Sequence, residues 1–131
     1  MNTYNRGWIG VDLDGTLAKY DQWQGPDHIG VPIPKMVNRV IKWMNNPNGP
    51  LVKIVTARVS PTNPDADVAR FYINKWLEKH ILSKLPPLED KRMSRRIPIT
   101  HEKDFAMIEL WDDRCVQVIP NTGERADGRQ D

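Results

Sequence analysis

The sequence predicts an α/β protein with a three-layer, Rossmann-like architecture, in which a mostly parallel sheet carries helices on both faces. Apolar strand-like runs alternate with segments of helical periodicity, in the order strand, helix, strand, helix, strand, strand. Polar or acidic residues follow three of the strand-like runs directly. The 131 residues are enough for one domain with a core of its own. We therefore expect right-handed crossovers and a ligand site beyond the carboxyl ends of the strands.

The composition is that of an ordinary globular protein, with 39% hydrophobic and 27% charged residues and a net charge of +2. This balance does not favour bulk attraction to nucleic acid or to a membrane surface. No run has the length of a signal peptide or a transmembrane segment, so we expect a cytoplasmic protein without membrane contact. Residues 1–121 are expected to form the single domain, and residues 122–131 a flexible tail.

The first strand is expected at Gly7 to Leu13, where apolar residues are nearly continuous, as in a central strand covered on both faces. Asp12 and Asp14 come at its end and point to the same side, because side chains alternate along a strand. Two carboxylates this close repel each other unless a cation lies between them or one keeps its proton. Gly15 lets the backbone approach a ligand. The segment fits a site for Mg²⁺ and a phosphate, or a plain surface strand with an Asp-Gly turn.

Residues 18–32 are too long for a simple strand-to-helix turn and are rich in turn-forming residues. They also carry Tyr20, Trp23 and His28, which makes them a candidate lid or binding loop. These three side chains are therefore candidate substrate-binding residues. The alternative is a surface excursion on which the aromatic residues pack.

Two helices are expected from apolar residues at helical spacing. The first begins near Pro34, a favourable first-turn residue, and ends before the turn-rich residues 45–50. The second covers about Asp65 to Ser83, and His80 lies at the flank of its apolar stripe, so we do not take it as a ligand. The apolar positions of the two helices are Met36, Val37, Val40, Ile41 and Met44, and then Ala69, Tyr72, Ile73, Trp76 and Leu77.

Four further segments complete the pattern of strands. A strand at 51–58 ends in Thr56 and Arg58, and Pro98 restricts residues 97–99 to a short edge strand. Residues 107–113 are a strand that ends in an acidic pair, and residues 115–119 are expected to form a last short strand in which Cys115 is buried. The basic run 91–96 is either a solvated surface or a patch that faces an anionic substrate.

The polar groups at the strand ends resemble the four short motifs of the haloacid dehalogenase-like superfamily of phosphohydrolases. Residues 12–17, Asp-Leu-Asp-Gly-Thr-Leu, look like its first motif, and Thr56 in Ile-Val-Thr-Ala-Arg looks like its second. Lys103 fits the third, with Lys91 as the other candidate at a greater distance from the fourth motif. Asp112 with Asp113 after an apolar strand fits the fourth. The matched span covers about residues 8 to 119, and the ordered set is more specific than any single motif.

The resemblance implies a role for each of these residues. Asp12 is the expected nucleophile and forms an aspartyl-phosphate, while Asp14 is the acid for the leaving group and then the base for water. Thr56 and Lys103 are expected to bind the phosphoryl group. Mg²⁺ is the expected cofactor, since its oxygen ligands would be the carboxylates and a backbone carbonyl. The implied metal ligands are Asp12, Asp14 through its carbonyl, Asp112 and, directly or through water, Asp113.

Many members of this superfamily carry a large cap domain, and neither insertion point here is long enough for one. The chain resembles capless or minimally capped members, which often act on large substrates or close the site with a partner subunit, so a homo-oligomer is an option. The loop 18–32 is then the local shield of the site, and Arg58 is placed to reach a substrate anion. The expected partner is a phosphorylated substrate, such as a nucleotide, a nucleic-acid end or a small metabolite.

Two other functions remain open at this point. A non-catalytic binding or regulatory module can keep the same fold. A phosphoryl-accepting signalling domain also combines acidic residues, Mg²⁺, Thr and Lys on a parallel sheet, but its acceptor Asp stands on a different strand from the first acidic pair. Placing Asp12 and Asp14 in one segment favours hydrolysis.

Overall fold

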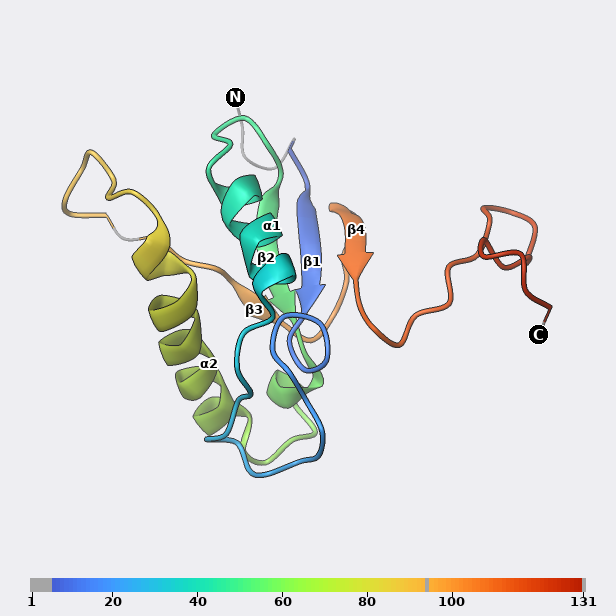
Figure 1. The fold of residues 1–131 in the computed structure, drawn as a ribbon, viewed down its shortest axis with the longest axis horizontal. Coiled ribbons are helices and arrows are strands. Elements are labelled where there is room, and N and C mark those ends of the chain that lie inside the picture. Colours follow the sequence, from blue (N-terminus) through green and yellow to red (C-terminus); the bar gives the residue numbers. More distant parts are fainter. Residues whose placement is uncertain (1–5, 94, 131) are drawn as a thin grey trace.

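The protein is an α/β domain built on a parallel sheet (Figure 1). The computed structural model describes residues 6–93 and 95–130, so residues 1–5, Ser94 of the basic run and Asp131 of the tail lie outside the described residues. The strands are β1 (Trp8–Asp12), β2 (Leu51–Val55), β3 (Ile99–Thr100) and β4 (Met107–Trp111). The helices are α1 (Pro34–Met44) and α2 (Ala66–His80), with single 3₁₀ turns η2 (Ala57–Val59) and η3 (Leu82–Lys84).

The four strands pair in the order β3-β2-β1-β4, and every pairing is parallel. β1 is central, as its continuous apolar run predicts, and its first four residues are buried. Pro98 immediately precedes the two-residue edge strand β3, and its carbonyl accepts a hydrogen bond from Ile54 N at 2.8 Å. Because all four strands run the same way, their carboxyl ends meet at one edge of the sheet.

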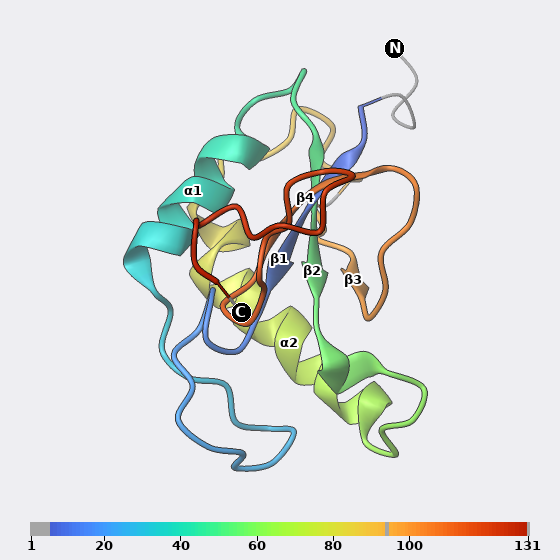
Figure 2. The same ribbon diagram turned by 90° about the vertical axis from the view of Figure 1, so that its right-hand side faces the viewer.

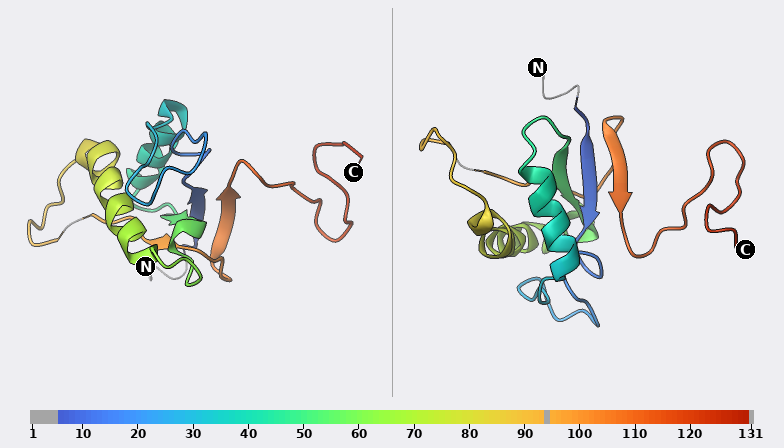
Figure 3. Two further views of the ribbon diagram at one scale, coloured as in Figure 1. Left: turned by 90° about the horizontal axis from the view of Figure 1, so that it is seen from below. Right: turned by 45° about the horizontal axis from the view of Figure 1, so that its top comes forward.

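Both helices pack on one face of the sheet, which corrects the expectation of helices on both faces (Figure 3). Ile9, Val11 and Ile54 from that face share one core with buried residues of α1 and α2. The order of the strands explains this. The steps from β1 to β2 and from β2 to β3 move in the same direction across the sheet, so right-handed crossovers place both connections on the same side.

The second face is crossed by residues 101–106, the connection from β3 to β4, which contains no helix. Trp8 points to this face and is buried, and its Nε1 donates to Asp104 Oδ1 at 2.7 Å. Lys53 lies over the Trp8 ring, 4.6 Å from its centroid, and 3.9 Å from Asp104. A short irregular segment therefore covers the place where the sequence led us to expect a helix.

The helices follow the sequence pattern closely. α1 begins at Pro34 and ends at Met44, and α2 ends at His80 with η3 continuing for one turn. His80 packs against Trp76 with the ring centroids 4.7 Å apart and the rings tilted by 56°, and burial lowers the pKa of its imidazole, in keeping with a helix-flank residue. No described helix is both long and apolar enough to cross a bilayer.

The prediction of a last strand at residues 115–119 is wrong, as is that of a buried Cys115. Residues 115–117 form no regular structure, and Val118 makes only an isolated bridge to Arg125. Cys115 is exposed. The segment leaves the sheet after β4 and extends to the right, away from the two helices, in Figure 1, so that it comes toward the viewer in Figure 2. An apolar run such as residues 115–119 favours a strand, but no strand among the described residues pairs with this segment to supply the ladder.

Candidate functional site

A cleft of about 560 Å³ lies at the carboxyl edge of the sheet, where the sequence predicted a site. It receives residues from the ends of β1, β2, β3 and β4, and from the loop 18–32. The predicted site residues in its lining are Asp12, Asp14, Tyr20, Trp23, Thr56, Arg58 and Asp112. The other lining residues are Val55, Ala57, Asn63, Asp65, His101 and Arg114.

Three carboxylates converge at the end of β1 and β4. Asp12, Asp112 and Asp113 each offer an oxygen, and these oxygens lie within 4.8 Å of one another. Burial, the adjacent Asp113 carboxyl and the negative charge of Asp112 raise the pKa of Asp12 to about 7. A hard cation would neutralise this repulsion, and carboxylate oxygens are the ligands that Mg²⁺ prefers. The donor set therefore fits the metal that the resemblance implies.

The turn after β1 brings its backbone against Asp113. Gly15 has a φ of +90°, and a Cβ at this position would lie 2.5 Å from Asp113 Oδ2, so the turn needs glycine both for its conformation and for space. Thr16 Oγ1 lies 3.2 Å from Asp113 Oδ1 and 3.5 Å from Asp12 Oδ2. The Gly15-Thr16 turn thus joins the first acidic strand end to the second.

Asp14 does not join the three-carboxylate cluster through its side chain. Its Oδ2 accepts from Arg58 Nε at 2.7 Å and its Oδ1 accepts from Arg58 Nη2 at 2.8 Å. Such a two-bond pair fixes the plane of the carboxylate as well as its position. Arg58, expected to reach a substrate anion, therefore binds Asp14 in this structure.

Arg58 is itself held from several sides. Its side chain is 6% exposed, and its guanidinium lies 4.8 Å from the ring centroid of Trp23. Its backbone N donates to Thr56 Oγ1 at 3.2 Å, and its carbonyl accepts from Asn63 Nδ2 at 2.7 Å. Its remaining nitrogen, Nη1, is buried and has no hydrogen-bond partner among the described residues. Since an unpaired buried donor costs free energy, this nitrogen is suited to donate a hydrogen bond to an anionic oxygen.

Three predicted residues do not line the cleft. His28 lines an adjoining hollow of about 250 Å³, together with Tyr20 and Arg58. Lys103 is exposed and lies in the connection that crosses the second face of the sheet. Asp113 is also absent from the lining, although it belongs to the carboxylate cluster.

Four polar or charged lining residues were not singled out as site residues by the sequence: Asn63, Asp65, His101 and Arg114. A signal existed for two of them. His101 directly follows β3, whose carboxyl end lies at the same sheet edge, and Arg114 directly follows the acidic pair. Asn63 and Asp65 belong to a loop between η2 and α2, and nothing in the residue types there pointed to the cleft.

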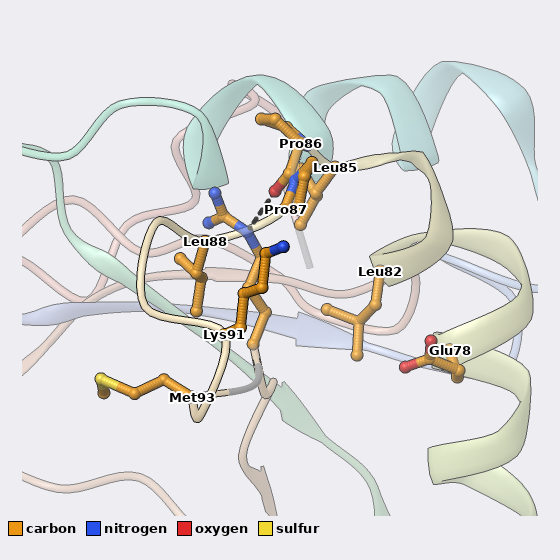
Figure 4. Close-up of a pocket in the computed structure, with 9 residues that line it drawn as sticks. Glu78, Leu82, Leu85, Pro86, Pro87, Leu88, Lys91 and Met93 are labelled. Carbon is orange, nitrogen blue, oxygen red and sulfur yellow. Dashed lines mark hydrogen bonds between the residues drawn. The ribbon is translucent and has the colours of Figure 1, made fainter.

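The basic run 91–96 lies elsewhere. Lys91 and Arg95 line a second hollow of about 380 Å³, beside the end of α2 and the residues that follow it (Figure 4). Arg95 Nε donates to Pro86 O at 3.1 Å, and much of the remaining lining is apolar. This hollow shares no residue with the cleft, so the structure gives Lys91 and Arg95 no contact with the candidate site.

Comparison of the chain with protein-family models, curated proteins and solved structures finds no match in any of the three. By its fold and its site, the protein is an α/β protein with a parallel sheet and an acidic, aromatic-lined cleft at the carboxyl edge of that sheet.

Proposed function

We propose that this protein is a Mg²⁺-dependent phosphomonoesterase of the haloacid dehalogenase-like type, acting in the cytoplasm. The observation that carries the proposal is the convergence of Asp12, Asp112 and Asp113 within 4.8 Å, beside a cleft that also receives Asp14 and Thr56. When bound, Mg²⁺ would be held by these three carboxylates and would screen their charge from an incoming phosphate. The strand order, with the two acidic strands β1 and β4 adjacent, supports the same assignment.

In this proposal the chemistry belongs to the two acidic residues of the first motif. An Asp12 oxygen attacks phosphorus, the bond from phosphorus to the leaving oxygen breaks, and Asp14 gives that oxygen a proton. Asp14 then takes a proton from the water that attacks the aspartyl-phosphate, which restores Asp12. Thr56 is buried at the cleft, and its hydroxyl hydrogen is available to donate to a phosphoryl oxygen because its oxygen accepts from Arg58 N.

The test compares hydrolysis of p-nitrophenyl phosphate with Mg²⁺ and with EDTA, in the wild type and in Asp12→Asn and Asp14→Asn. We expect Mg²⁺-dependent turnover that falls by about 10³-fold or more in both variants, as expected for the loss of a nucleophile or an acid-base group. Asp67→Asn, an exposed residue of α2, is the matched control and should keep full activity.

One observation favours a second candidate, a module that binds Mg²⁺ and an anion without turning the anion over. Lys103, the expected phosphate-binding lysine, is not in the cleft lining, and both oxygens of Asp14 are engaged by Arg58. This candidate predicts binding of Mg²⁺ and of beryllofluoride without hydrolysis of any phosphomonoester. Wild-type protein that binds neither would exclude both functions.

A further inference from the structure

The base of the loop 18–32 is fixed to the domain on two sides. Lys19 N donates to Val31 O at 2.9 Å, which closes the loop at its ends. Trp76 of α2 donates from Nε1 to Gly30 O at 2.9 Å. At Gly30 a side chain has no room, because a Cβ would collide with the carbonyl of Lys19. The loop therefore leaves the domain in a defined direction, and its aromatic residues are held at a defined place.

Trp23 is the residue that this loop brings to the cleft. Its indole lies against the Arg58 guanidinium at 4.8 Å, and the same guanidinium is fixed by its two bonds to Asp14. Yet Trp23 remains 51% exposed, and Tyr20, also in the lining, is 38% exposed. One part of the indole is thus backed by a rigid cation while a large apolar area stays open at the cleft.

A lid that only excludes water does not account for this arrangement. Such a lid would place an apolar side chain over the reacting carboxylates, whereas the contact of Trp23 is with Arg58. An exposed aromatic ring that is already oriented gains free energy from a flat partner at little entropic cost. Asp65 in the same lining adds a carboxylate, which suits an N–H or hydroxyl donor of a nucleoside, whereas the Asn63 amide is already bonded to Arg58 O and Asp65 N.

We infer that Trp23 is a stacking platform for a nucleobase, and that the substrate is a phosphomonoester of a nucleoside rather than a sugar phosphate. The inference rests on the proposed function for the position of the phosphate at the three carboxylates. The volume of about 560 Å³ lies in the range of small-molecule sites and exceeds what a phosphate needs. A free mononucleotide and the phosphorylated end of a nucleic acid share this chemistry.

The kinetic test compares a substrate that carries a nucleobase with one that has none. We would measure kcat and KM for adenosine monophosphate and for glycerol 2-phosphate in the wild type, Trp23→Leu and Trp23→Phe. A stacked base contributes about 1–3 kcal/mol, so Trp23→Leu should raise KM for the nucleotide by about 5- to 150-fold. Glycerol 2-phosphate should change by less than about 2-fold, and Trp23→Phe should restore most of the nucleotide affinity. Phe71→Leu, an exposed aromatic of α2, is the matched control.

Equal losses with both substrates would show a lid, and no loss with either would show a surface residue; each outcome overturns the inference. Parallel assays with 5′- and 3′-phosphorylated oligonucleotides decide between a free nucleotide and a nucleic-acid end. The natural class of substrate should have a lower KM than the other.

A binding measurement separates this inference from the proposed function. Calorimetric titration of adenosine monophosphate and of glycerol 2-phosphate, with Mg²⁺ present, needs no turnover. A preference for the nucleotide that Trp23→Leu removes supports the inference even in a protein that hydrolyses nothing, in which case only the phosphatase proposal fails. Equal affinity for the two ligands, or no binding of the nucleotide, overturns the inference whether or not p-nitrophenyl phosphate is hydrolysed.

Discussion

Arg58 holds both carboxylate oxygens of Asp14, with hydrogen bonds of 2.7 and 2.8 Å from Nε and Nη2. In the proposed reaction Asp14 transfers a proton in each half of the cycle, so at least one of these bonds must lengthen as a proton moves. The pair also joins the turn after β1 to the end of β2, two segments 44 residues apart. Arg58 therefore acts on Asp14 as a positioning residue, and Trp23 covers the same guanidinium.

The first prediction concerns the pair of hydrogen bonds from Arg58 to Asp14. Arg58→Lys keeps the charge but loses the two-bond geometry, so we expect kcat to fall by about 10- to 100-fold, roughly the effect of misplacing an acid-base group. The kcat of Arg58→Ala should fall further. Hydrolysis of p-nitrophenyl phosphate at saturating substrate measures the effect, and its dependence on pH should change shape because the environment of Asp14 changes.

The chain supplies a matched control for that substitution. Arg92 makes the same two-bond pair with Asp90, through Nε and Nη2 at 3.0 Å, but it is exposed and does not line the cleft. Arg92→Lys should leave kcat and KM unchanged, because exposed pairs contribute little. Equal kcat for wild type and Arg58→Lys would contradict a positioning role for Arg58.

A second prediction concerns Gly15, whose turn lies against Asp113. Gly15→Ala introduces backbone strain at a φ of +90° and a Cβ at 2.5 Å from Asp113 Oδ2. Displacing Asp113 opens the carboxylate cluster, so the Kd for Mg²⁺ should rise by about tenfold or more, within the range seen when the surroundings of a metal ligand are disturbed. Isothermal titration with Mg²⁺ measures it.

Gly123→Ala is the control that separates the effect of backbone strain from that of the Cβ contact with Asp113. Gly123 has a similar φ of +76°, but a Cβ there meets nothing within 4 Å. Both variants should lose about 1 kcal/mol of stability from the left-handed backbone, and only Gly15→Ala should lose Mg²⁺ affinity. Unchanged Mg²⁺ affinity in Gly15→Ala would show that Asp113 is not a ligand, directly or through water.

The fold was predictable where the sequence determines local structure, and unpredictable where a tertiary partner decides. The helix that begins near Pro34 and a short edge strand at residues 97–99 were predicted, because proline and apolar spacing act locally, although the strand lies at Ile99–Thr100. Residues 115–119 form an apolar run like that of a strand, but a strand also needs a neighbour, which the sequence does not reveal. The position of both helices on one face follows from strand order, which is likewise a tertiary property.

The candidate site shows the same division. Asp12, Asp14, Thr56 and Asp112 were predictable because each lies within two residues of the end of a strand, and parallel strands end at one edge. The Arg58–Asp14 pair was not, since residue spacing does not tell which partner a long side chain selects. His101 was overlooked because β3 is only two residues long, so its end did not stand out in the sequence.

A third prediction follows from the pKa of Asp12, which burial and the neighbouring Asp113 and Asp112 raise to about 7. The ordinary value is 3.8, so the folded protein binds this proton more tightly than the unfolded chain does. Without metal, the stabilisation is complete below about pH 4 and is lost as pH rises towards 7. A shift of this size corresponds to about 4 kcal/mol for a fully buried group, and solvent at the partly exposed Asp12 reduces the expected loss to about 1–2 kcal/mol.

Thermal unfolding between pH 5 and 8 tests whether stability falls as pH rises. The Tm in EDTA should fall with rising pH more steeply in the wild type than in Asp12→Asn, which has no such proton to lose. Mg²⁺ should raise the Tm of the wild type more at pH 8 than at pH 5.5, because protons compete for Asp12 at the lower pH. An Mg²⁺ effect that is equal at both pH values would argue against Asp12 as a ligand.

A fourth prediction uses the single cysteine as a reporter of the carboxylate cluster. Cys115 is exposed, and the pKa of its thiol is raised, first by burial and then by the negative charges of Asp112, Asp12 and Asp113. Mg²⁺ bound at these carboxylates would cancel their charge and lower the pKa of the thiol. Because the thiolate is the reactive form, iodoacetamide at pH 8 should modify Cys115 about 2- to 5-fold faster with Mg²⁺ than with EDTA. Asp112→Asn should remove most of this difference in rate.

Free glutathione under the same conditions is the control, and Mg²⁺ should not change its rate of modification. A modification rate that Mg²⁺ leaves unchanged in the wild type would mean that the metal does not bind beside Asp112, whatever the activity of the protein.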